Sequence, residues 1–126
     1  MTFSIIARCH KTGQFGGAIS SSSPAVAARC IQARAGVGVA TSQNITDPHL
    51  ANILLDMIKY DLAPEESIVE LVKNTEFIEY RQLSVINSGE KPAAFSGKNT
   101  LGVYSQCIGE HAVGAGNLLA NETIPK

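Results

Sequence analysis

The chain has 126 residues and a formal net charge of −1, which suits a single domain over residues 1–126. A hydrophobic content of 44% and a charged content of 17% exclude a disordered or fibrous chain. The sequence has no basic run, no tryptophan and few other aromatic residues, so it lacks the usual patterns of nucleic-acid binding. We therefore expect a globular domain without a nucleic-acid partner.

The first residues do not resemble a signal peptide, and no apolar stretch is long enough to span a bilayer. The three cysteines are odd in number and widely spaced, which fits neither a metal site nor a set of disulfides. The three histidines are also far apart in the sequence. We expect a cytoplasmic protein that has no membrane partner, no metal and no other cofactor.

The amino-terminal quarter predicts strands. Residues 2–9 alternate between two faces, residues 10–13 are typical of a turn, and residues 14–20 predict the returning strand of a hairpin. Cys9 shares a face of the first strand with apolar side chains, which favours a small buried residue. A third strand is predicted over residues 26–33.

The next segments predict one more strand and then two helices. Residues 36–43 continue the strand pattern, after a turn at residues 34–36. Asp47 can cap a helix whose apolar residues recur at helical spacing as far as Leu62. Pro64 then begins a second helix with two acidic residues in its first turn.

The last part of the chain predicts strands again, over residues 81–87, 92–96 and 111–117. Residues 97–109 predict a loop, and residues 123–126 resemble the start of another helix. Strands grouped in blocks around two helices predict an α+β fold with antiparallel sheets.

The start of the chain offers a candidate for catalysis. If Met1 is removed, Thr2 carries a nucleophilic hydroxyl together with an α-amine whose reference pKa is about 7.7–8.0. Arg34 is the candidate for a cation beside it, and the small residues 16–23 would leave room for a substrate. The alternative interpretation is that Thr2 only begins a strand.

A second candidate is the thiol of Cys30. Its neighbour Arg29 would favour the thiolate, but the sequence identifies no general base for it. Thiol chemistry at Cys30 therefore stays a lesser alternative to catalysis at Thr2.

Six segments, in order, resemble the bacterial DUF1028 family, an uncharacterised branch of the N-terminal-nucleophile (Ntn) hydrolases. They are residues 2–8 (TFSIIAR), 33–38 (ARAGVG), 42–48 (SQNITDP), 80–83 (YRQL), 93–97 (AAFSG) and 115–120 (AGNLLA). The resemblance implies a four-layer αββα sandwich, with two sheets between two layers of helices. It also implies longer family members, so we expect a truncated chain or one fragment of a domain that is incomplete at its C-terminus.

The resemblance also implies roles for individual residues. Thr2 falls at the position of the nucleophile and Arg34 at that of the basic residue on the third strand. Gln43 and Asn117 fall in family motifs at strand ends and are expected substrate-binding residues, with backbone capping as the alternative interpretation. Ser4, on the same strand face as Thr2, and Ser20 and Ser21, among the small residues 16–23, are also expected to bind substrate.

Two functions are weighed on this basis. The first is an amide hydrolase that acts on a small molecule or peptide through Thr2. The alternative is a non-catalytic domain for small-molecule binding or assembly that keeps the fold. In either case a homo-oligomer is an expectation.

Overall fold

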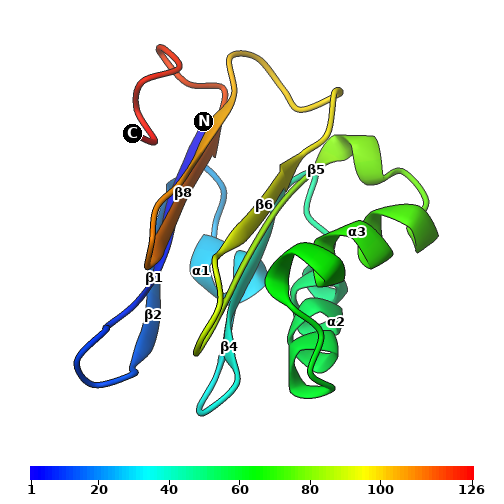
Figure 1. Ribbon diagram of the computed structural model, residues 1–126. Coiled ribbons are helices and arrows are strands. Elements are labelled where there is room, and N and C mark those ends of the chain that lie inside the picture. The colour runs from blue at the N-terminus through cyan, green and yellow to red at the C-terminus, as the bar shows by residue number, and fades with distance from the viewer.

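The structure, a computed structural model, describes residues 1–126 as two antiparallel β-sheets with the two longer helices on one side (Figure 1). The strands are β1 (Thr2–Arg8), β2 (Phe15–Ser21), β3 (Ile31–Arg34), β4 (Gly38–Asn44), β5 (Arg81–Asn87), β6 (Ala93–Ser96), β7 (Ser105–Ile108) and β8 (Ala112–Asn117). The helices are α1 (Val26–Cys30), α2 (Pro48–Lys59) and α3 (Pro64–Asn74), followed by a short 3-10 helix at Ile78–Tyr80. The predicted α+β class is therefore confirmed.

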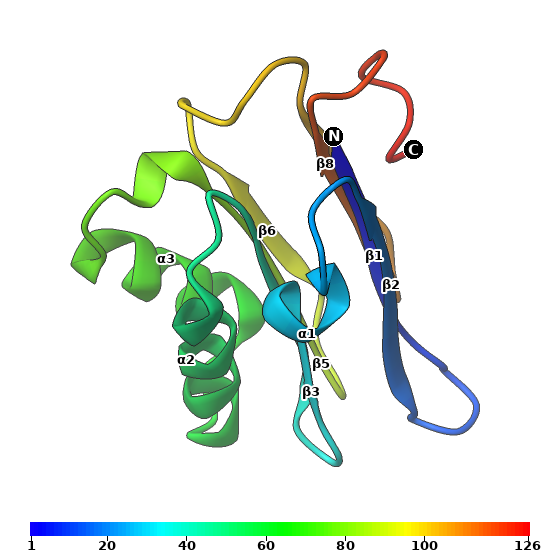
Figure 2. The ribbon, with the colours of Figure 1, turned by 180° about the vertical axis from the view of Figure 1, so that it is seen from behind.

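The two sheets stack face to face. Sheet A has the strand order β2-β1-β8-β7 and sheet B the order β3-β4-β5-β6. Helices α2 and α3 cover the outer face of sheet B, whereas no helix covers the outer face of sheet A (Figures 1 and 2). The molecule described here thus has three layers: sheet A, sheet B and a pair of helices.

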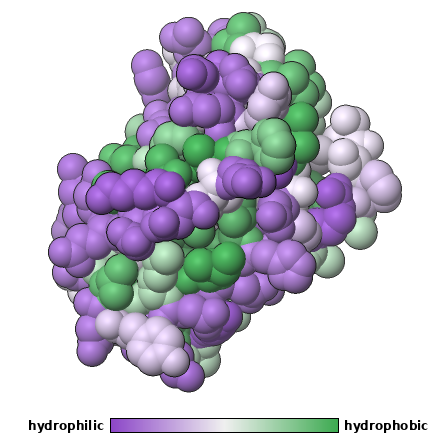
Figure 3. Space-filling model, turned by 90° about the vertical axis from the view of Figure 1, so that its right-hand side faces the viewer, coloured by the Kyte–Doolittle hydropathy of each residue, from purple (hydrophilic) through white to green (hydrophobic).

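The larger hydrophobic core lies between sheet B and the two long helices. Asp47 caps α2, because its side-chain oxygen accepts a hydrogen bond from the backbone N–H of His49 at 3.0 Å. The inward positions of α2, such as Leu50, Leu54 and Leu55, pack against sheet B and α3. The solvent side of this layer is largely hydrophilic with separate apolar areas (Figure 3).

None of the helices combines the length and apolar character that a membrane span requires.

A smaller core lies between the two sheets. Its four buried residues come from β1, β4, β5 and β8, and they are Ile6, Val39, Ile86 and Val113. Alternation along β1 points Thr2, Ser4 and Ile6 toward sheet B, while Phe3 and Ile5 are exposed on the outer face of sheet A. The predicted alternation of β1 side chains between two faces is therefore confirmed.

The predicted strand over residues 26–33 is wrong in its first half. Residues Val26–Cys30 form helix α1, and only Ile31–Arg34 belong to a strand. The segment contains two consecutive alanines, which have the highest helix propensity. Moreover, the Arg29 side chain donates to the carbonyl of Pro24 and joins the helix to the turn before it.

Three smaller predictions are also corrected. Cys9 is exposed, because β1 ends at Arg8 and Cys9 begins the turn. Strand β7 lies inside the segment predicted as a loop. Residues 123–126 form a turn instead of a helix, with the Lys126 N–H donating to the Thr123 carbonyl at 3.1 Å.

The close packing at Gly38 predicts that a larger residue there destabilises the pairing of β4 with β5. A methyl group at this position would lie 2.2 Å from the carbonyl oxygen of Ile86, so Gly38→Ala forces the backbones apart. We expect a loss of about 1–3 kcal/mol in the free energy of unfolding, measured by urea denaturation. Gly16→Ala is the matched control, because nothing lies within 4 Å of its added methyl group. Equal effects of both substitutions would contradict the packing described here.

Candidate functional site

A buried hydrogen-bond network joins the two sheets at one end of their interface. Gln82 of β5 is its centre and is 0% exposed. Its Oε1 accepts hydrogen bonds from Nε2 of Gln43 at 3.2 Å and from Nδ2 of Asn117 at 3.0 Å. Its Nε2 donates to Ser96 Oγ and to the carbonyl of Gly116, both at 3.0 Å. One side chain therefore ties β4, β6 and β8 to β5.

Further polar pairs extend this network. Ser96 Oγ donates to Gln106 Oε1 of β7 at 2.8 Å, and the hydroxyls of Thr41 and Ser84 lie 2.5 Å apart. The interface between the sheets is thus apolar around Ile6 and polar around Gln82. Buried polar groups of this kind contribute stability only while each keeps its partner.

A cavity of about 100 Å³ lies at the polar end of the interface. Its lining is almost entirely polar and comes from the first residue of β1, the end of β2, helix α1 and the end of β4. The lining residues are Thr2, Ser21, Ser23, Val26, Arg29, Cys30, Gln43, Asn44 and Thr46.

Thr2 lies at the edge of this cavity because of its place in sheet A. It is the first residue of β1 and pairs with Ser21 of β2 on one side and with Asn117 of β8 on the other. Its Oγ1 is 2.8 Å from Ser21 Oγ, and the side chain is partly buried. The Thr2 hydroxyl is therefore held in position by a neighbouring hydroxyl.

Gln43 has one polar atom without a partner. The residue is 1% exposed, and its Oε1 makes no hydrogen bond although its Nε2 donates to Gln82. An unpaired buried acceptor costs about 1–3 kcal/mol. Gln43 is one of the residues that line the cavity, so its unpaired oxygen belongs to the wall of the cavity.

Five non-glycine residues have a positive φ; three of them lie in or next to the segments around the cavity, whereas Asp61 and Phe77 lie elsewhere. Asn44 (φ 77°), Ala25 (φ 51°) and Leu118 (φ 51°) adopt the left-handed conformation, which is uncommon for residues other than glycine. Asn44 lines the cavity, Ala25 precedes α1, and Leu118 follows Asn117. Strained residues tend to cluster at functional sites, so their position supports this cavity as the candidate site.

The structure brings together three of the residues predicted to form the site. Thr2, Ser21 and Gln43 line one cavity, and Asn117 lies beside Thr2 in the sheet and bonds to Gln82. Ser4 and Ser20 do not line it. Ser20, together with Phe3 and Ile5, borders a hollow at the outer face of sheet A, whereas the Ser4 side chain is buried and donates to the carbonyl of Ala115.

Arg34 does not lie where the sequence interpretation expects it. The register pairs Ile31 with Thr41 and Arg34 with Gly38, so β3 runs away from the cavity. The Arg34 guanidinium forms an ion pair with Asp56 and donates to Asn52 of α2 instead. The expectation of a cation at Arg34 beside Thr2 is not met, because Arg34 ends β3 opposite Gly38, the first residue of β4, whereas the cavity lies at the last residues of β4.

Arg29 and Gln82 are the main contributors that sequence interpretation missed. Arg29 is the only charged residue that lines the cavity. The alanine-rich segment after Pro24 was the available signal for α1, and recognising this helix would have drawn attention to Arg29. Nothing in the sequence distinguishes Gln82 as a buried centre, because its neighbours in the network come from three other strands.

The cysteines differ in their surroundings. Cys30 is 2% exposed, and its Sγ lies 3.5 Å from Thr46 Oγ1. Cys9 is exposed in the turn after β1, and hydrogen bonding to the Thr12 side chain lowers the pKa of its thiol, with smaller contributions from the backbone of Thr12 and Lys11. No cluster of three or more His, Cys, Asp or Glu side chains forms a metal site.

Comparison with known proteins defines the family. Residues 2–126 match DUF1028, a family of unknown function, and the chain belongs to it. The crystal structure of protein SPO2555 from Silicibacter pomeroyi, a DUF1028 protein, is similar with a TM-score of 0.93 and 23% sequence identity. The match covers 98% of the present chain and 58% of that protein's chain, so the present chain spans little more than half of its length. No curated protein matches the chain.

The network around Gln82 generates a prediction about stability. Gln82→Met keeps the shape of the side chain but leaves the amides of Gln43 and Asn117 and the carbonyl of Gly116 without their partner. We expect a loss of roughly 2–4 kcal/mol in the free energy of unfolding, because several buried polar groups become unpaired. Urea denaturation measures the effect, and Gln14→Met in the exposed turn is the control. If both variants unfold at the wild-type midpoint, the network does not hold the sheets together.

Proposed function

We propose that this protein is an amide hydrolase of the N-terminal-nucleophile class, with Thr2 as its nucleophile after removal of Met1. The observation that carries the proposal is the position of Thr2 at the start of β1, at the edge of a small polar cavity. Met1 is 51% exposed, and its carbonyl accepts a hydrogen bond from the backbone N–H of Ser22 at 3.4 Å, so its removal costs one long backbone hydrogen bond.

The proposed reaction uses two groups of the same residue. The Thr2 Oγ1 attacks the carbonyl carbon of the substrate amide, and the α-amine of Thr2 accepts the hydroxyl proton. The amine then passes this proton to the leaving nitrogen as the C–N bond breaks, which leaves an acyl ester on Thr2. Water adds to the ester with the amine as base, releases the acid and restores the hydroxyl.

Neighbouring groups suit this chemistry. The Ser21 hydroxyl, at 2.8 Å, orients the Thr2 hydroxyl. The unpaired Oε1 of Gln43 accepts the N–H of a substrate amide. Arg29 lines the same cavity as Thr2. It is therefore the supporting cation in this proposal, in place of Arg34.

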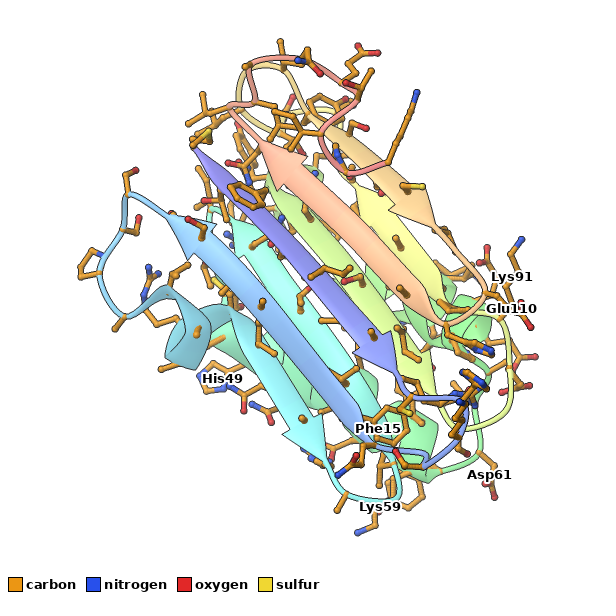
Figure 4. The ribbon with its side chains drawn as sticks, turned by 90° about the vertical axis from the view of Figure 1, so that its left-hand side faces the viewer. Phe15, His49, Lys59, Asp61, Lys91 and Glu110 are labelled. Atoms are coloured by element: carbon orange, nitrogen blue, oxygen red, sulfur yellow. The ribbon has the colours of Figure 1, made fainter.

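We also propose that the complete fold is a four-layer αββα sandwich in which helices cover the outer face of sheet A. That face exposes Phe3 (43%) and Ile5 (50%), and its neighbouring positions on β8 are glycines. In Figure 4 the face lies open toward the viewer, without a helix in front of it. A sheet with apolar side chains on both faces is stable when both are covered.

The test of the hydrolase begins with the amino terminus. Mass spectrometry of the protein from its native cell is expected to show that Met1 is absent. That protein is then assayed against a library of small amides, and Thr2→Ala is expected to lower turnover by roughly 10³-fold or more. Arg34→Gln, outside the cavity, is expected to keep turnover within about threefold.

Other outcomes would count against the hydrolase. A retained Met1 in the native protein would remove the free amine that the mechanism requires. Saturable ligand binding without turnover, unchanged by Thr2→Ala, would instead support the non-catalytic binding domain.

The fourth layer has its own prediction. In the protein from its native source, hydroxyl-radical labelling of Phe3 is expected to be about tenfold slower than that of Tyr60, because a helix covers Phe3. Tyr60 is the control, since it is 77% exposed at the end of α2. Fast labelling of both residues would mean that the outer face of sheet A is open.

A further inference from the structure

The cavity beside Thr2 has an unbalanced charge. Arg29 is the only charged residue among its nine lining residues, and no carboxylate lines it. Arg34 forms an ion pair with Asp56, and the other close contact between a basic and an acidic side chain joins His111 to Glu110, so Arg29 has no acidic partner. A cation in a small, partly buried site favours an anion as its ligand.

The Arg29 guanidinium is also held in one orientation. Its Nε and Nη2 both donate to the carbonyl oxygen of Pro24 at 3.2 Å, while Nη1 makes no hydrogen bond. The carbonyl is neutral, so it fixes the side chain without cancelling its charge. A group fixed in this way loses little conformational entropy when it binds a ligand.

Gln43 places a second requirement on the ligand. Its buried Oε1 lacks a donor, and a ligand N–H would satisfy it. The cavity of about 100 Å³ has room for several water molecules, and therefore for a small end group of a ligand. The lining thus presents a cationic donor and a neutral acceptor, together with the hydroxyl of Thr2.

We propose that this cavity binds compounds that carry a carboxylate next to an amide N–H, as in an N-acyl amino acid. The carboxylate bonds to Arg29 and the amide N–H to Oε1 of Gln43. The substrate class rests on the proposed function at Thr2, whereas the binding of the carboxylate does not depend on turnover.

The test measures binding to a protein that cannot turn the ligand over. The Thr2→Ala variant is titrated with N-acetylglycine and with its neutral counterpart N-acetylglycinamide, and amide shifts are followed by NMR. We expect N-acetylglycine to bind at least about tenfold more tightly than N-acetylglycinamide, because its carboxylate forms a charge-assisted hydrogen bond with Arg29. The shifts are expected at residues of the cavity, such as Ser21 and Asn44.

Substitutions of Arg29 test whether this residue causes the preference for N-acetylglycine over N-acetylglycinamide. In the same background, Arg29→Gln is expected to abolish it, Arg29→Lys to retain part of it, and Lys73→Gln on α3 to leave it unchanged. The unfolding midpoint of each variant shows whether the fold persists. Equal affinity for the two probes, no binding of either, or a preference that survives in Arg29→Gln would overturn the proposal.

The two proposals fail in distinguishable ways. A carboxylate preference without turnover in the protein that lacks Met1 would discard the hydrolase and keep the anion site. Turnover of neutral amides with no carboxylate preference would keep the hydrolase and discard the anion site.

Discussion

The four hydrogen bonds of Gln82 are the constraint on which the interface between the two sheets depends. The side chain is completely buried and contacts groups from β4, β6 and β8. An apolar cluster around Ile6 closes the other end of the interface. Because the amide of Gln82 has two donors and one acceptor group, its neighbours must be placed to match them. The network therefore specifies the relative orientation of the two sheets as well as the distance between them.

This arrangement has a consequence for the cavity at Thr2. The amides that hold the sheets also fix the orientation of Gln43, whose Nε2 is bound to Gln82 and whose Oε1 is left unpaired. The strained backbone at Asn44 ends β4 at the same point, and its side chain bonds to the carbonyl of Tyr80 at 2.6 Å. Rigid support of this kind prepares a site before a ligand arrives.

The sequence could predict most of the fold and part of the site. Alternation along β1 and helical spacing along α2 reflect local periodicity, and both predictions are confirmed. The strand predicted for residues 26–33 fails because a short apolar segment fits a helix and a strand equally well. The helix that forms there instead places Arg29 in the lining of the cavity.

The sequence by itself determined the class of fold, the face of β1 on which Thr2 lies, and the family. These properties depend on neighbouring residues or on ordered motifs, which a linear chain records directly. Only the tertiary structure decided that Arg29 shares a cavity with Thr2 and that Gln43 keeps a free acceptor there. Such properties depend on the register between strands and on contacts between residues far apart in the chain, which no local pattern contains.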